Sequence, residues 1–212
     1  FVAGLWPALA FDPTGKGYLF WRNVHNGQFP VQDWQSSDLE LDELPTGGGT
    51  SKICLAAGGN SKSAWGGRNT VVVAKGQPMV VFDQCEFTGP EAEGHDVIWM
   101  RRKPDGTWTA PRTALAVANT QTGASLAWAE TGPDAGTYGI AVVDRSTDTL
   151  QYIESTQGET WTAPDPVHAV GSGGWYPSLS FSPITHEPAV AYYVCAESEA
   201  VSESACPASQ DE

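Results

Sequence analysis

Apolar and polar residues alternate along most of this chain, in short segments separated by turn-forming residues. Such alternation is typical of β-strands, whose successive side chains point to opposite faces of a sheet. Apolar residues nowhere keep the three- and four-residue spacing of a helix over a dozen positions, so we expect almost no helix. In the middle of the chain the predicted strands span 70–74, 78–83, 96–102, 107–115, 123–129, 138–144, 149–154 and 160–168.

Two sequence repeats indicate that these strands form tandem units. The pentapeptide T-W-T-A-P occurs at 107–111 and again at 160–164, each time after a glycine-containing turn that predicts a hairpin. The segment 6–13, W-P-A-L-A-F-D-P, resembles Y-P-S-L-S-F-S-P at 176–183, about three periods further along. Weaker copies of the same opening occur at 68–83 and 123–130.

A unit of roughly 50 to 60 residues with four antiparallel strands fits the blade of a β-propeller, in which each sheet packs between its neighbours. A β-sandwich is the alternative, but it explains the strands and turns without explaining the fixed repeat. We therefore predict an all-β chain that contributes about three and a half four-stranded antiparallel blades to a β-propeller. The predicted blades lie at about 6–57, 68–117, 123–170 and 176–194, within a partial propeller of residues 1–194.

One repeat resembles a known family signature. The segment 155–161, S-T-Q-G-E-T-W, resembles a degenerate Asp-box, the S-x-D-x-G-x-T-W hairpin of bacterial neuraminidase repeats in sialidases and many other propellers. Thr156 stands at the aspartate position of the box and Glu154 at its serine position. In that family the box is a folding element on the periphery, away from the ligand. The resemblance therefore implies a propeller fold, with Trp108 and Trp161 as packing anchors rather than sugar platforms.

The fourth unit is incomplete, and this predicts a partner. After Tyr192 and Tyr193 the sequence runs into Ser, Ala and Glu residues, whereas closed propellers use about four to eight blades. We expect a second polypeptide, or another copy of this chain, to supply the remaining strands and to cover the open edge of strand 188–194. The alternative is a small four-bladed ring in which residues 197–212 cover that edge.

Charge excludes some classes of partner. The chain has 11 Lys and Arg against 25 Asp and Glu, a formal net charge of -14, which repels nucleic acids and anionic membranes. The longest basic run, 101–103, is soon followed by Asp105, so we interpret it as a solvated strand end. No segment approaches the roughly 20 apolar residues of a membrane span. We expect neither a nucleic-acid partner nor a transmembrane segment.

The four cysteines lack the spacing of zinc or haem motifs. In an oxidising compartment the simplest pairing is Cys54 with Cys85 and Cys195 with Cys206. We therefore expect a secreted, periplasmic or cell-surface protein. The acidic, Ser- and Ala-rich tail at 195–212 is expected to be poorly ordered unless the second disulfide tethers it.

The candidate ligand site follows from the predicted fold. Propellers usually bind ligands at one mouth of the central channel, near loops that leave the inner strands. An acidic and aromatic mouth with scattered arginines could hold a glycan, through aromatic stacking and hydrogen bonds to hydroxyl groups. The alternative is that the aspartates cap turns and pair with surface arginines. The candidate ligand-binding residues are Trp21, Arg22, His25, Asp83, His95, Asp96, Asp144 and Arg145.

Catalysis and metal binding have weaker support. Sialidases use three arginines, a tyrosine–carboxylate pair and an aspartate acid, but the family's F-R-I-P start is absent from this chain. Asp83, Asp96 and Asp144 are the candidate catalytic carboxylates, and no spacing selects two of them. The histidines are scattered, so no metal site is predicted; a structural calcium ion on turn aspartates is the one cofactor that the acidity favours.

These observations favour a secreted binding or assembly module that recognises carbohydrate or an extracellular protein. The alternative is a glycoside hydrolase of sialidase-like propeller type, with a site shared with further blades.

Overall fold

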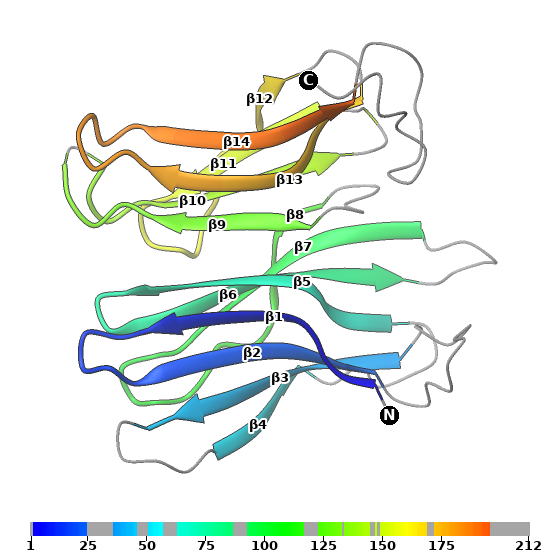
Figure 1. Ribbon diagram of the computed structural model, residues 1–212, viewed down its shortest axis with the longest axis vertical. Helices are drawn as coiled ribbons and strands as arrows, with labels where there is room; N and C mark the ends of the chain where they lie inside the picture. The colour runs from blue at the N-terminus through cyan, green and yellow to red at the C-terminus, as the bar shows by residue number, and fades with distance from the viewer. Residues whose placement is uncertain are drawn as a thin grey trace. The chain divides into compact units, whose positions relative to one another are not determined.

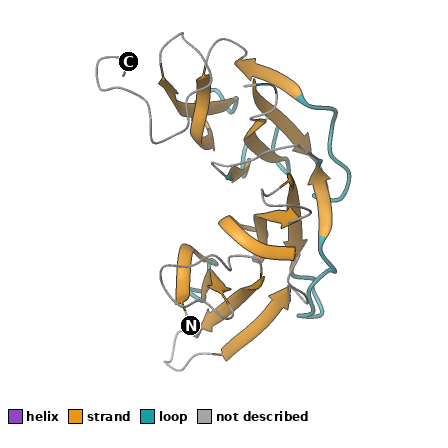
Figure 2. Cartoon of the chain, turned by 90° about the vertical axis from the view of Figure 1, so that its right-hand side faces the viewer, coloured by secondary structure: helices purple, strands orange, loops and turns teal. Residues whose placement is uncertain are grey.

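The computed structural model describes residues 2–24, 36–45, 51–56, 63–86, 93–116, 123–132, 134–144, 147, 149–168 and 172–195. These residues form fourteen strands and no helix (Figure 2). No helix that could cross a membrane occurs among them. The chain divides into two compact units, Phe1–Ala116 and Val117–Glu212, and each is described by itself.

The eight strands of the first unit belong to one hydrogen-bonded sheet, which divides into two four-stranded antiparallel blades (Figure 1). Blade 1 has the order β1 (Val2–Phe11), β2 (Gly17–Val24), β3 (Ser36–Leu44) and β4 (Ser51–Ala56). Blade 2 has the order β5 (Ser63–Ala74), β6 (Gln77–Glu86), β7 (Glu93–Arg101) and β8 (Arg112–Leu115). A two-residue parallel pairing of β3 with β5, at Ser36 and Ser63, connects the two sheets.

The second unit contains a further four-stranded sheet and a hairpin. Blade 3 has the order β9 (Ala124–Trp128), β10 (Tyr138–Asp144), β11 (Thr149–Ser155) and β12 (Asp165–His168), all antiparallel. Blade 4 is the pair β13 (Ser172–Phe181) and β14 (Pro188–Cys195). Within the described residues β14 pairs with β13 alone.

The core of the first unit lies between its two sheets. Blade 1 contributes alternate residues of β2 and β3, and blade 2 contributes alternate residues of β6 and β7, because only every second side chain of a strand faces the neighbouring sheet. The cluster comprises Tyr18, Phe20, Leu39, Leu41, Val80, Phe82, Ile98 and Met100. In the second unit, blades 3 and 4 meet in the same way, through Ala127, Ala141, Leu150 and Leu179.

The alternation predicted that the T-W-T-A-P segments begin the fourth strands, at 107 and 160. The structure shows that this prediction is wrong. The segments precede β8 and β12, which start at Arg112 and Asp165. In blade 2 the Thr109 N–H donates to the Arg101 carbonyl, and the Arg101 N–H donates to Thr109 Oγ1 at 3.0 Å. Thr162 makes the same two hydrogen bonds with Glu154 in blade 3. The repeat therefore fastens each turn to the third strand before the fourth strand begins.

Trp108 is a packing anchor, as the Asp-box resemblance implied. Its ring meets Phe20 edge-on, with the ring centroids 5.7 Å apart, and packs on the core between blades 1 and 2. The glycine-containing turn before Trp161 is held by Ser155, whose Oγ accepts a hydrogen bond from the Gly158 N–H at 2.8 Å.

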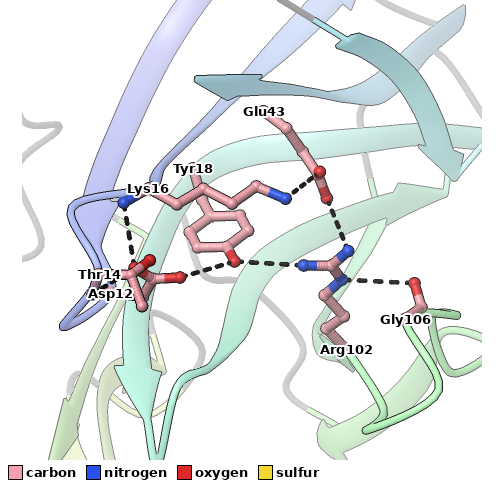
Figure 3. Close-up of polar contacts among 7 residues, drawn as sticks. All are labelled: Asp12, Thr14, Lys16, Tyr18, Glu43, Arg102 and Gly106. Carbon is pink, nitrogen blue, oxygen red and sulfur yellow. Dashed lines mark hydrogen bonds and ion pairs between the residues drawn. The ribbon is translucent and has the colours of Figure 1, made fainter. Parts of the chain in front are cut away.

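A polar network connects the turns at one end of blades 1 and 2 (Figure 3). The Tyr18 hydroxyl donates to Asp12 Oδ2 and accepts from Arg102 Nη1, both at 3.2 Å. Arg102 also pairs with Glu43, which in turn pairs with Lys16. Burial raises the pKa of the Tyr18 hydroxyl, so it stays protonated as a donor. The interpretation of the basic run 101–103 as a solvated strand end is therefore wrong for Arg102, which links two sheets.

Candidate functional site

The first strands of three blades share one irregularity. In β1, β5 and β13 the pairing register shifts close to a residue that is not glycine yet has a positive φ. These residues are Trp6 (φ 47°), Arg68 (φ 29°) and Tyr176 (φ 51°). In blade 3, Gly123 (φ 78°) precedes β9 at the corresponding position. A left-handed conformation costs an L-residue roughly 1–2 kcal/mol, and β-bulges are common next to active sites, where they re-aim side chains. We call this position the bulge of each blade.

In blades 1, 2 and 4, a polar residue of the second strand pairs with the residue just before the bulge. Leu5, just before the blade 1 bulge, pairs with Arg22, and Gly67, at the same place in blade 2, pairs with Asp83. In blade 4 the corresponding residue is Tyr193. Both Arg22 and Asp83 are buried, which is unusual for charged residues and is found where they have specific partners.

In the first unit, three residues meet at the bulge of blade 1. The Arg22 guanidinium carbon lies 5.1 Å from the centroid of the Trp6 ring, within the range of a cation–π interaction. Asn69, which follows the blade 2 bulge, donates from Nδ2 to the Trp6 carbonyl at 2.8 Å. This bond connects the backbone at the bulge of blade 1 to blade 2. Asn69 is only 9% exposed, and its Oδ1 has no hydrogen-bond partner among the described residues.

The predicted site residues fall into separate places. Arg22 shares a face of blade 1 with Phe20 and Leu39, toward blade 2. Trp21 is on the opposite face, where its Nε1 donates to Asp42 at 3.3 Å. The structure therefore brings Arg22 to the bulge and turns Trp21 away from it.

Two of the three candidate catalytic carboxylates lie on opposite faces of one sheet. Asp83 on β6 pairs with Val97, whereas Asp96 on β7 pairs with Gln84. Directly opposed residues share a face and neighbours along a strand do not, so the two carboxylates point away from each other. Asp144 ends β10 in the second unit, where it is buried and its carbonyl accepts a hydrogen bond from the Thr147 N–H.

The remaining predicted residues lie outside the described part of the structure. His25 and Arg145 fall between described segments, and His95 lies on β7 with its side chain outside the description. The same holds for the side chains of Cys54, Cys85, Cys195 and Cys206, so the two disulfides stay predictions. Among the side chains that are described, no group of three or more His, Cys, Asp or Glu residues could hold a metal ion.

Sequence reasoning missed Trp6, Arg68, Asn69 and Tyr176 as candidate site residues. A signal was present in the aligned openings W-P-A-L, R-N-T-V, G-A-S-L and Y-P-S-L. Only blade 3 has glycine at the first position, and a glycine there marks a backbone that needs a positive φ. The other three blades must then adopt the same conformation with a side chain present.

No protein-family model matches this chain. A search among curated protein sequences also finds no match. Solved structures do match: the α-L-arabinanase of Penicillium chrysogenum complexed with arabinobiose aligns over 90% of this chain at 12% identity, with a TM-score of 0.57. A glycosyl hydrolase from Bacteroides ovatus aligns over 90% at 10% identity, with a TM-score of 0.56. A putative glycosidase from Bacteroides thetaiotaomicron aligns over 93% at 13% identity, with a TM-score of 0.52.

The chain has a β-propeller fold. It contributes three four-stranded blades and the two strands of a fourth within its described residues, which confirms the predicted all-β, three-and-a-half-blade architecture. The chain spans 61%, 60% and 63% of the three solved structures. The finer resemblance to Asp-box sialidase repeats stays a prediction.

Proposed function

We propose that this chain is a carbohydrate-binding propeller module whose ligand lies against the bulge of blade 1. The observation that carries the proposal is the meeting of Trp6, Arg22 and Asn69 at that bulge. The matched structures support the ligand class, because their names describe an arabinanase, a glycosyl hydrolase and a glycosidase.

The chemistry of these three side chains suits a sugar. The half-buried Trp6 ring offers an aromatic face for the C–H groups of a sugar ring. The Arg22 guanidinium donates several hydrogen bonds in a fixed plane, which matches pairs of neighbouring hydroxyls. The Asn69 Oδ1 adds an acceptor for a hydroxyl donor. Few precisely placed polar groups on an apolar base are the usual composition of a small-molecule site.

The positions of the candidate carboxylates favour binding over catalysis. Most glycosidases need two carboxyl groups on either side of one glycosidic bond. Asp83 and Asp96 point to opposite faces of blade 2 and do not form such a pair. The alternative remains a glycoside hydrolase, of the sialidase-like type or another, in which the buried Asp83 acts together with a carboxylate from a further blade.

We also propose that further blades come from a second polypeptide or another copy of this chain. Leu9 and Phe11 on β1 are 50% and 59% exposed, although such residues are normally covered between blades. Among the described residues β14 pairs with β13 alone, and this supports the same proposal. We include secretion in this proposal because the predicted disulfides require an oxidising compartment. An extracellular protein is the alternative ligand.

A glycan array beside an assay on chromogenic glycosides tests this function. We expect saturable binding without turnover. Arg22→Met removes a charged donor and should weaken binding at least tenfold, since hydrogen bonds to charged groups are worth about 1.5–3 kcal/mol. Lys103→Met, which removes a positive charge from an exposed turn of blade 2, is the matched control and should bind as the wild type does.

Three outcomes would contradict the proposal. Absence of binding to every glycan would refute carbohydrate recognition. Turnover of a glycoside that is lost in Asp83→Asn would favour the hydrolase instead, whereas turnover that survives Asp83→Ala, Asp96→Ala and Asp144→Ala would reject the candidate carboxylates.

A further inference from the structure

Neighbouring blades within each unit pack in one recurring way. The first strand of a blade inserts two apolar side chains, two residues apart, into the face of the preceding blade. In blade 2 these are Val71 and Val73, which pack on the core between blades 1 and 2. In blade 4 they are Leu179, in the core between blades 3 and 4, and Phe181, which packs against it. Residues two apart on a strand share one face, so each pair enters the same neighbour.

The face of blade 3 that receives this pair is built from small residues. They are two cross-strand pairs of β9 and β10, Ser125 with Ala141 and Ala127 with Gly139. The Leu179 N–H donates to Ser125 Oγ at 2.9 Å. A Cβ atom built on Gly139 would lie 3.0 Å from Leu179 Cδ2. Blades 3 and 4 therefore approach closely because these positions carry no bulky side chain.

Blade 1 exposes an inserting pair of the same kind. The aligned openings W-P-A-L-A-F and Y-P-S-L-S-F place Leu9 and Phe11 at the inserting positions of β1. Leu9 and Phe11 are 50% and 59% exposed, whereas Leu179 is 7% exposed. Ala10, between them, pairs with Tyr18 of the core toward blade 2, so Leu9 and Phe11 face away from blade 2. They are ready to enter the face of another blade.

Blade 4 exposes a receiving face. Ser178 pairs with Ala191 and Ser180 pairs with Ala189, at the positions of the two receiving pairs of blade 3. All four residues are exposed and uncharged. Ser178 stands where Ser125 accepts the interblade hydrogen bond. Ala189 adds one methyl group where blade 3 has glycine, which a small movement of a flexible leucine side chain accommodates.

We propose that the exposed face of blade 4 receives Leu9 and Phe11 of a second copy of this chain. The contact repeats the interface between blades 3 and 4, with the Leu9 N–H of one copy donating to Ser178 Oγ of the other. This inference rests on the part of the proposed function that calls for further blades, and it selects another copy over a different polypeptide. The reason is that one chain exposes both halves of the contact. Because the two halves differ, the contact is heterologous.

Sedimentation velocity on the full chain tests this contact. We expect the wild type to assemble at about 100 μM, where an interface with a micromolar Kd leaves little free monomer. Phe11→Ser removes an inserting side chain and Ala191→Trp fills the receiving face. Each variant should weaken assembly by about tenfold or more, since burial of a large apolar side chain is favourable and overpacking is not. Each copy has a net charge of -14, so added salt should strengthen assembly of the wild type.

A mixture of the two variants provides the decisive measurement. Phe11→Ser keeps the receiving face and Ala191→Trp keeps the inserting pair, so an equimolar mixture should form dimers although neither variant does so alone. Val167→Ser, on β12, loses an apolar side chain that is 45% exposed and should assemble as the wild type does. All these positions are exposed, so melting temperatures should change by no more than a few degrees. Leu9→Ser and Ser180→Trp repeat the test if either first variant fails to fold.

Each contrary result has a distinct meaning. A wild type that stays monomeric but binds glycans would overturn this inference and leave carbohydrate recognition standing. A native particle in which a different polypeptide covers Leu9 and Phe11 would overturn it as well, in favour of a second polypeptide. Assembly that survives Ala191→Trp but not Phe11→Ser would show that two blade 1 faces meet, which also overturns it. Assembly as expected without binding to any glycan would support this contact and refute the proposed ligand.

Discussion

Gly132 offers the sharpest test of how blades 3 and 4 are joined. It lies in the turn between β9 and β10 with a φ of 86°. A Cβ atom built on it would lie 2.0 Å from His186 Cγ and 2.4 Å from His186 Cβ. His186 belongs to the β13–β14 turn, where its N–H donates to the Ser182 carbonyl and its ring lies 3.4 Å from Thr131 Oγ1. The two turns can therefore meet only because residue 132 has no side chain.

The expected cost of Gly132→Ala has two parts. Holding alanine at a positive φ costs roughly 1–2 kcal/mol. The overlap involves the base of the His186 ring rather than a flexible end, so the β13–β14 turn must move, at an overpacking cost of about 1–3 kcal/mol. The free energy of unfolding should fall by about 2–5 kcal/mol in total.

Urea denaturation followed by tryptophan fluorescence measures this fall, and a matched variant separates its two parts. Gly136 lies in the same turn with a φ of 95°, but a Cβ there meets only Trp128 Cη2 at 3.9 Å. Gly136→Ala should therefore cost only the backbone part. Removal of the ring by His186→Gly should reduce the cost of Gly132→Ala to the same value, which gives a coupling of about 1–3 kcal/mol in a double-mutant cycle.

The reasoning fails if Gly132→Ala costs no more than Gly136→Ala. It also fails if the cost of Gly132→Ala is the same with and without the His186 ring, because the contact between the two turns would then play no part.

Three further predictions concern the polar groups. Arg102→Met removes the guanidinium from the network of Figure 3 and should lower the free energy of unfolding by about 1–3 kcal/mol in urea, whereas the exposed Lys103→Met should change it by less than about 0.5 kcal/mol. The hydrogen bond from the Thr14 hydroxyl lowers the pKa of Asp12 below 3.8. The Asp12 carboxylate therefore stabilises the fold above pH 3.8, and this stabilisation is lost as the pH falls through the folded-state pKa. In Thr14→Val, NMR titration should show the pKa of Asp12 raised toward 3.8. Burial raises the pKa of the Tyr152 hydroxyl above 10. The stabilisation that this hydroxyl contributes is therefore complete below pH 10 and is lost at higher pH. In thermal melts above pH 10, Tyr152→Phe should lose less stability than the wild type does.

Strand positions could be predicted closely wherever the backbone is regular. The predicted strand 138–144 is β10, and 149–154 is β11 to within one residue. Alternation is a local property of sequence, and a regular strand keeps it. The predicted strand 70–74 captures only the second part of β5, which starts at Ser63, because the bulge at Arg68 interrupts the alternation.

The candidate site could be predicted only in part. The positions of Arg22 and Asp83 near the ends of second strands follow from strand pattern and turns, and the structure places both across from bulges. That Trp21 faces away from Arg22 follows from the period of two. The separation of Asp83 from Asp96, however, depends on the register between β6 and β7, which no single strand specifies.

The amino-acid sequence by itself therefore determined the all-β class, the repeat and most of the strands, since alternation, turn residues and tandem similarity are carried by neighbouring residues. Tertiary structure alone decided which residues meet: Asn69 with Trp6 across two blades, Arg102 with Tyr18, and His186 with the empty space at Gly132. It also placed Trp6, Arg68 and Tyr176 at a positive φ. Local preference opposes that conformation for such side chains, so only contacts between distant segments can impose it.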